Sequence, residues 1–112
     1  MENSIFVKVK NGFKKVNIDS ILFFESDCNY SKLTLVNGDI FLTCSTIGNI
    51  EKQLEFTNLL RVHKSYMINI QFIEEVLTEK CSNSCQLILK GNIKILVARR
   101  RKSFLFKLIA KI

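Results

Sequence analysis

The chain has 112 residues, of which 47% are hydrophobic and 24% charged, with four glycines and no proline. Collagen-like, low-complexity and largely disordered proteins are excluded, because they need a glycine or proline bias or a shortage of apolar residues. A total of 17 Lys and Arg against 10 Asp and Glu gives a formal net charge of +7, which favours a polyanionic partner such as nucleic acid or an anionic membrane surface.

The first part of the chain predicts a series of β-strands. Short runs of β-branched and aromatic residues recur at 5–7, 21–24, 33–36 and 40–43. Between the last two runs, Asn37-Gly38 predicts a hairpin with a type I′ turn, in which both central residues have positive φ. Asn11-Gly12 indicates a second hairpin.

The middle of the chain predicts a short helix followed by two strands. An apolar stripe at helical spacing comes directly after Ser45 and Thr46, either of which can cap the helix: Ile47, Ile50 and Leu54. Residues 59–69 then have apolar flanks around a basic centre, which predicts two strands joined by a loop at 63–65. Residues 70–77 follow as a short helix or a strand, and periodicity alone does not decide between them.

The last part of the chain predicts a hairpin and an amphipathic helix. The hairpin runs from 85 to 97 and turns at Gly91-Asn92. The helix covers 102–112, with Ser103 as its cap. Its apolar positions match one helical face: Leu105, Leu108, Ile109 and Ile112. No repeat, proline-rich linker or charge block divides the chain, so we predict one domain over residues 5–112.

The positive charge is concentrated near the carboxyl end. Residues 80–112 contain nine basic residues and no carboxylate. Arg99-Arg100-Arg101-Lys102 lies between the predicted strand and the predicted helix, where arginine can fork onto a phosphate or a guanine. Cations at a helix N-terminus oppose the helix dipole, so the cluster weakens local structure and favours a functional role over a solvated turn.

No enzyme, cofactor or metal centre is predicted. The only histidine is His63, and no sequence-evident triad or metal-ligand set surrounds it. Glu25 and Asp27 are the only close carboxylate pair near a strand end, and we interpret them as a solvated edge. The chain has no membrane-span pattern and no signal peptide, so we expect a cytoplasmic protein with reduced thiols at all four cysteines. A redox switch at Cys28 is an alternative to a plain free thiol there.

Three segments of the chain form a recognisable set: IDSILFFESDCNY at 18–30, LLRVHKSYMIN at 59–69 and VARRRK at 97–102. Together they resemble the LytTR-type DNA-binding domain, the output domain of bacterial response regulators of the LytR/AlgR kind. The middle segment resembles the family's F-x-R-[IV]-H-[RK]-S-[YF]-[IVL]-[IV]-N, with Leu60 in place of the usual aromatic. Ala98 stands where the family often has serine. Response regulators of this family carry a receiver domain upstream, whereas the domain begins here at Ile5, so we expect a form without a receiver, either free-standing or truncated.

The resemblance implies a mainly β fold, with several small antiparallel sheets and one or two short helices, which reads DNA through loops. It implies base contacts at the start of the strand after Asn29-Tyr30, at the residue after the motif histidine, and in the basic segment. Including the polar residues beside these positions, the expected DNA-binding residues are Ser31, Lys32, Arg61, His63, Lys64, Arg99, Arg100, Arg101 and Lys102.

We therefore predict a bacterial transcription regulator that binds double-stranded DNA sequence-specifically, contacting successive major grooves at direct repeats as two copies of the chain. An alternative is an interaction module or anti-regulator, which would use the same basic face on a partner regulatory protein without base specificity. RNA binding is less favoured, because sequence-specific RNA sites usually need exposed aromatics and the chain has no tryptophan.

Overall fold

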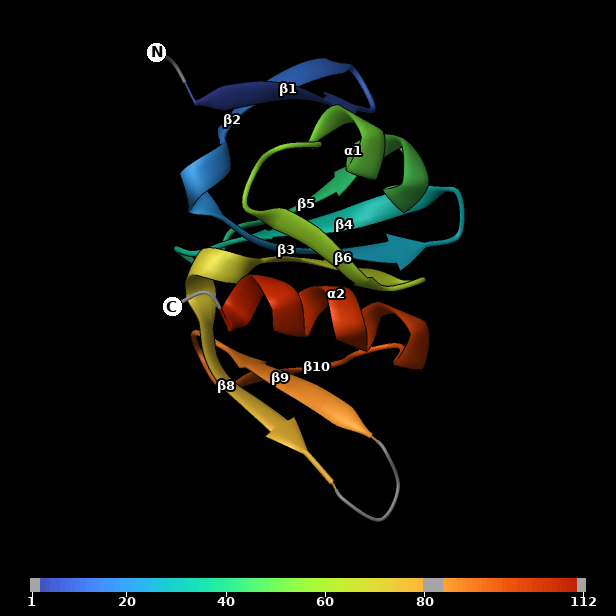
Figure 1. The fold of residues 1–112 in the computed structure, drawn as a ribbon. Helices are drawn as coiled ribbons and strands as arrows, with labels where there is room; N and C mark the ends of the chain where they lie inside the picture. The colour runs from blue at the N-terminus through green and yellow to red at the C-terminus, as the bar shows by residue number, and fades with distance from the viewer. Residues whose placement is uncertain (1–2, 80–83, 111–112) are drawn as a thin grey trace.

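A computed structural model of the protein describes residues 3–79 and 84–110. These residues form strands and helices in the order shown in Figure 1. The strands are β1 (Ser4–Val9), β2 (Gly12–Asn17), β3 (Ile21–Asp27), β4 (Tyr30–Leu35), β5 (Ile40–Thr43), β6 (Leu59–His63), β7 (Tyr66–Asn69), β8 (Ile73–Thr78), β9 (Cys85–Leu89) and β10 (Ile93–Leu96). The helices are α1 (Ile47–Gln53), α2 (Arg99–Ile109) and two 3-10 helices, η1 (Ile18–Ser20) and η2 (Ile70–Phe72).

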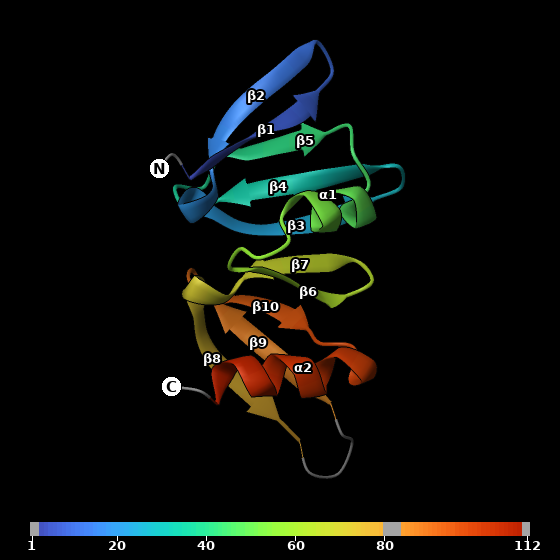
Figure 2. The ribbon, with the colours of Figure 1, turned by 45° about the horizontal axis from the view of Figure 1, so that its top comes forward.

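The strands of the described residues make three antiparallel sheets, which confirms the predicted fold class. β1 and β2 pair as a separate hairpin. The largest sheet has five strands in the order β5-β4-β3-β7-β6, and the third has the order β10-β9-β8. The hairpin and the third sheet lie at opposite ends of the molecule, with the five-stranded sheet between them (Figure 2).

A first core lies between the β1–β2 hairpin, α1 and one face of the five-stranded sheet. Val7 and Val16 of the hairpin are only 3% and 4% exposed, and they pack with Phe24 of β3. The predicted α1 stripe of Ile47, Ile50 and Leu54 closes this core. The Thr46 side chain accepts a hydrogen bond from the Asn49 amide at 3.2 Å, so the prediction of a helix here, with Thr46 as one of its two candidate caps, is confirmed.

A second core lies on the other face of the same sheet. There β9, β10 and α2 cover Phe23 of β3, Val62 of β6 and Ile68 of β7. Leu105 of α2 is fully buried in it. Burial of apolar surface contributes about 25 cal/mol per Å², so both cores contribute to holding the central sheet in place.

The undecided segment at 70–77 is mainly a strand. After the short η2 turn, β8 pairs with β9 along its length. Asn69 fixes the turn, because its side-chain oxygen accepts from the Gln71 amide at 3.0 Å and its amide nitrogen donates to the Ile21 carbonyl at 2.9 Å.

The Asn37-Gly38 hairpin is present, but its turn differs from the expected type I′. Only Gly38 has positive φ, at 96°. The Gly38 amide donates to the Leu35 carbonyl at 3.0 Å, and the Leu35 amide donates to the Asp39 carbonyl at 2.8 Å. This pattern is a type I turn followed by a glycine bulge. The Asn37 side chain accepts from the Asp39 amide at 2.9 Å, which favours this loop over the tighter one.

α2 begins earlier than predicted. Ala98 is its N-cap and makes no side-chain capping bond, whereas Ser103, the expected cap, lies inside the helix. The four consecutive cations therefore occupy the start of α2 rather than a turn before it. Ile112, expected on the apolar face, is outside the described residues. None of the helices in the two described ranges is long and apolar enough to cross a membrane.

Candidate nucleic-acid interface

Three segments that contain or adjoin predicted site residues lie at one edge of the molecule. They are the β3–β4 turn at 28–29, the β6–β7 turn at 64–65 and the start of α2 at 98–102, and both views place them on the same side (Figures 1 and 2). We call these residues the loop edge. Lys64, Arg99 and Arg100 are exposed there, so the edge is rich in accessible positive charge.

The β6–β7 turn and the start of α2 form one surface. The Ala98 amide donates to the Val62 carbonyl at 2.8 Å, which joins the end of β6 to the residue before α2. Above this junction is a hollow of about 530 Å³, lined by His63, Lys64, Ala98, Arg99, Arg100 and Arg101. We call it the basic hollow. The fold thus brings together two basic segments that are far apart in the sequence.

Arg61 supports the β6–β7 turn and is not free to contact a ligand. One of its terminal nitrogens donates to the Lys64 carbonyl at 2.6 Å, and Nε donates to the His63 carbonyl at 3.4 Å. The other terminal nitrogen donates to Glu51 Oε1 at 3.1 Å. The side chain is only 18% exposed. Its position makes Arg61 a residue that positions Lys64 rather than one of the exposed cations.

Arg101 is held by the same carboxylate. Its Nη1 lies 3.7 Å from Glu51 Oε2 and donates to the Arg61 carbonyl at 3.3 Å. Its side chain is 25% exposed, whereas Arg99 and Arg100 are both exposed residues. Glu51 therefore joins α1, β6 and α2. It also neutralises charge that would otherwise oppose the α2 dipole.

His63 ends β6 and lines the basic hollow. Its Nδ1 accepts a hydrogen bond from the Ser65 amide at 3.1 Å, so the ring carries its proton on Nε2. The ring lies 5.6 Å from the Tyr66 ring. The Tyr66 hydroxyl donates to Glu25 Oε2 at 3.2 Å. Burial raises the pKa of Tyr66, and the Glu25 carboxylate raises it further.

The two predicted residues of β4 lie on opposite faces of the sheet. Ser31 is completely buried, and its hydroxyl donates to the Ser45 carbonyl at 2.7 Å. Because the hydroxyl is already used inside the protein, Ser31 is not available to DNA in this structure. Lys32 has a side chain 44% exposed, and its nitrogen lies 3.9 Å from Glu25. A surface pair at this distance is weak, so Lys32 can exchange it for another anion.

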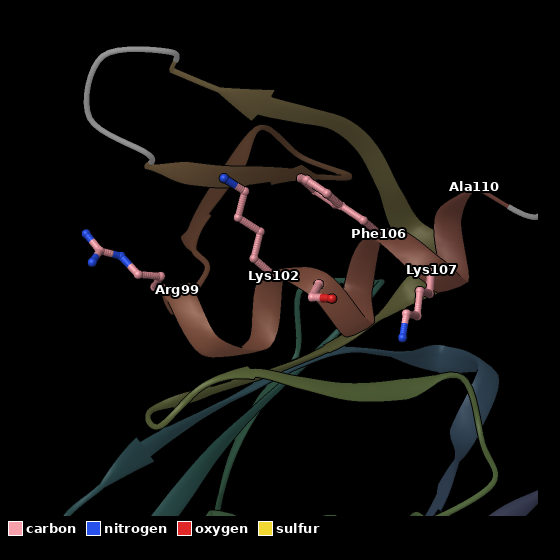
Figure 3. A pocket seen from close by; sticks show the side chains of 6 residues that line it. Arg99, Lys102, Phe106, Lys107 and Ala110 are labelled. Atoms are coloured by element: carbon pink, nitrogen blue, oxygen red, sulfur yellow. The ribbon is translucent and has the colours of Figure 1, made fainter.

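The flank of α2 carries more cations, but they do not converge. A hollow of about 560 Å³ is lined by Arg99, Lys102, Ser103, Phe106, Lys107 and Ala110. Figure 3 shows Lys102 and Lys107 extending to opposite sides of the helix, while Arg99 points away at its start. The Lys102 nitrogen lies 5.7 Å from the centre of the Phe106 ring. This arrangement suits separate contacts along a polyanion better than one enclosed anion.

Within the described ranges, no group of three or more His, Cys, Asp or Glu side chains could hold a metal ion. Three of the four cysteines are described, all as free thiols: Cys28, Cys44 and Cys85. Burial raises the pKa of the Cys85 thiol, while nearby Lys102 opposes this.

Sequence reasoning missed Glu51, the residue that joins the two basic segments. It lies on a short helix, outside the three recognised segments, and its two arginine partners are 10 and 50 positions further along the chain. No local pattern distinguishes a carboxylate of this kind from one on a solvated helix face.

Comparison with known proteins identifies a family and a similar solved structure. A family model described as the LytTr DNA-binding domain matches residues 11–110. The structure is similar to the LytTr DNA-binding domain of a Bacillus cereus protein described as a methyl-accepting/DNA response regulator, with a TM-score of 0.78 and 15% sequence identity. The match covers 97% of this chain and 98% of that one. Among curated proteins, no sequence matches this chain.

Proposed function

Because the chain belongs to the LytTR family of DNA-binding domains, we propose that it is a bacterial transcription regulator that recognises a specific duplex sequence through its loop edge. The observation that carries the proposal is the basic hollow, where the β6–β7 turn and the start of α2 meet. Base recognition needs side chains held in a fixed geometry, and the Glu51 network supplies this for the two segments. Such a regulator acts in the cytoplasm, where the bacterial chromosome lies.

In this proposal Lys64 and Arg100 read base edges in the major groove. An arginine can donate two hydrogen bonds to guanine O6 and N7, and a lysine can donate to the same acceptors. Arg61 and Arg101 act from behind as positioning residues, since their guanidinium groups are already bonded within the protein.

Phosphate contacts come from the side chains around these two positions. Arg99 is exposed at the first residue of α2, where helix amides without internal partners also favour an anion. The Nε2 of His63 and the nitrogens of Lys32 and Lys102 are further donors for phosphate oxygens. The molecule is 47 Å along its longest axis, which is longer than the 34–36 Å or so between successive major grooves on one face of DNA. We expect one copy to contact two grooves, and two copies to lie on direct repeats.

The test is a selection of duplexes from a random pool at two salt concentrations, read by sequencing. It is run in parallel on the wild-type chain, Arg100→Ala and Lys102→Ala, with Lys90→Ala as a control on the β9–β10 turn. Arg100→Ala is expected to lose about 1–3 kcal/mol at one base pair, whereas Lys102→Ala weakens all sequences alike.

Two results would contradict the proposal. Uniform weakening by both Arg100→Ala and Lys102→Ala would refute the assignment of base reading to Arg100. Recovery of only salt-sensitive duplexes without a motif would refute sequence-specific recognition and favour the alternative of a protein-interaction module.

A further inference from the structure

We propose that the β1–β2 hairpin is a second DNA-contacting arm, which binds phosphates beyond the loop edge. This proposal rests on the proposed function, because it concerns the same duplex. The hairpin carries four lysines, at positions 8, 10, 14 and 15, and residues 3–18 contain no Asp or Glu. The charge is therefore unbalanced within the hairpin itself.

The lysines nearest the tip are available to a ligand. Lys8 and Lys10 are exposed, and within residues 3–79 and 84–110 no carboxylate forms an ion pair with either. Lys14 points back to the body, with its nitrogen 4.5 Å from the centre of the Phe41 ring. Lys8 is paired across the hairpin with Phe13, which is 70% exposed.

The hairpin tip faces the same way as the loop edge. β1 ends at Val9 and β2 begins at Gly12, so the tip is Lys10-Asn11. Figures 1 and 2 both place this tip on the side of the β3–β4 and β6–β7 turns, at the end of the molecule away from α2. A duplex that lies along the loop edge would continue past the tip.

The hairpin is fixed to the rest of the fold. The Cys44 amide donates to the Lys8 carbonyl at 2.7 Å, and the Gln53 side chain donates to the Phe6 carbonyl at 3.1 Å. The buried Val7 and Val16 add apolar packing. Such an arm is already ordered before binding, so little conformational entropy is lost when its lysines meet phosphates.

Lysine at these positions fits phosphate better than bases. Its ammonium is a compact charge on a flexible stem, which suits a backbone contact without sequence information. The arm is therefore expected to lengthen the footprint and strengthen binding without changing the recognised motif.

The test compares Lys8→Gln/Lys10→Gln with Lys90→Gln/Lys94→Gln, a matched pair on the β9–β10 hairpin, in the full chain. Each variant is titrated against the duplex selected by the wild-type protein over a range of salt, and backbone contacts are mapped by phosphate ethylation interference. Because one phosphate contact contributes about 0.9 to the slope of log affinity against log salt, the first pair is expected to reduce the slope by about 1.8. It should also lose interference at one flank of the site, while the motif stays the same and the control pair behaves as wild type.

Lys8→Arg/Lys10→Arg should retain the wild-type slope and footprint, because it keeps both charges. An unchanged slope and footprint for Lys8→Gln/Lys10→Gln on a duplex that the wild type recognises would overturn the arm and leave the proposed function standing. If the wild type recognises no duplex motif, the proposed function fails, and the arm fails with it. If Lys8→Gln/Lys10→Gln instead loses affinity only for single-stranded DNA and keeps its affinity for the duplex, the hairpin binds unpaired bases, with Phe13 stacking on them and the lysines on the backbone. That result would also overturn the arm.

Discussion

Glu51→Gln is expected to weaken specific DNA binding, although it removes a negative charge from a basic surface. The carboxylate lies 3.1 Å from Arg61 and 3.7 Å from Arg101, and Arg61 in turn holds the Lys64 carbonyl at 2.6 Å. The amide of glutamine has nearly the same shape but no charge. It therefore tests whether the charge fixes the β6–β7 turn against the start of α2.

The size of the effect follows from the exposure of the three side chains. Glu51 is 39% exposed, and its partners are 18% and 25% exposed. A hydrogen bond to a charged group contributes about 1.5–3 kcal/mol when buried, and an exposed ion pair about 0.2–1 kcal/mol. We expect the free energy of unfolding to fall by about 1–2 kcal/mol, which lowers Tm by about 5 °C in a domain of this size.

The direction in which DNA affinity changes in Glu51→Gln distinguishes a positioning role of Glu51 from a simple repulsion between its charge and DNA. If the turn must be ordered again on binding, fixing one residue costs about 1–2 kcal/mol, so affinity for the specific duplex should fall by about tenfold. Affinity for a scrambled duplex should stay the same or rise slightly, because one repulsive charge is gone. Thermal unfolding and competition titrations on both duplexes measure these quantities.

Glu55→Gln is the control for this prediction. It makes the same change of charge four residues further along, at an exposed position. If Glu51→Gln and Glu55→Gln raise the affinity for both duplexes to the same degree and leave Tm unchanged, Glu51 acts only as a local negative charge. That result would refute its positioning role.

Three further predictions concern Ser31, the described cysteines and Tyr66. Ser31→Ala should reduce the free energy of unfolding, measured in urea, by about 0.5–1.5 kcal/mol, because it removes the donor of a part-buried hydrogen bond; a shift in base preference would show that the side chain is exposed on binding. Iodoacetamide should label Cys28 faster than Cys85 near neutral pH, because Cys28 is exposed and burial raises the pKa of Cys85. Mass spectrometry measures the two labelling rates, and equal rates would contradict the prediction. Burial and Glu25 raise the pKa of Tyr66, so its contribution to stability is complete below the unfolded pKa of 10.0 and is lost as pH rises above that value. In urea unfolding at a series of pH values, Tyr66→Phe should reduce this loss of stability at high pH. An unchanged loss would exclude Tyr66 as its source.

Most of the fold could be predicted from the sequence because its signals are local. β-Branched runs bounded by glycine turns predict the hairpins, and the spacing of Ile47, Ile50 and Leu54 predicts α1. The turn at Asn37 escaped because the same dipeptide fits two loop types, and a side-chain bond to Asp39 decides between them. The start of α2 was not predicted because Ser103 offers a conventional cap. The observed start is set by a tertiary hydrogen bond from the Ala98 amide to the Val62 carbonyl.

The positive charge of the candidate site could be predicted from the sequence. Which of its cations are exposed and which are bonded within the protein could not. Arg61 and Lys64 are both cations of one motif and look alike in the sequence, yet the Arg61 side chain is only 18% exposed whereas Lys64 is an exposed residue. Strand alternation separates Ser31 from Lys32, and its direction depends on which face of the sheet is covered. The contribution of Glu51 depends on a tertiary contact between elements far apart in the chain.

The placement of Phe23 and Phe24 in different cores restricts which insertions, deletions and substitutions β3 can accept during evolution. The two rings are consecutive in β3 but belong to opposite faces of the central sheet. Deletion or insertion of one residue before them would reverse every later side chain of the strand and exchange its contributions to both cores at once. We therefore expect β3 to accept volume-conserving substitutions in variant libraries but no change of length, while length changes collect in the exposed turn at 28–29 that follows it.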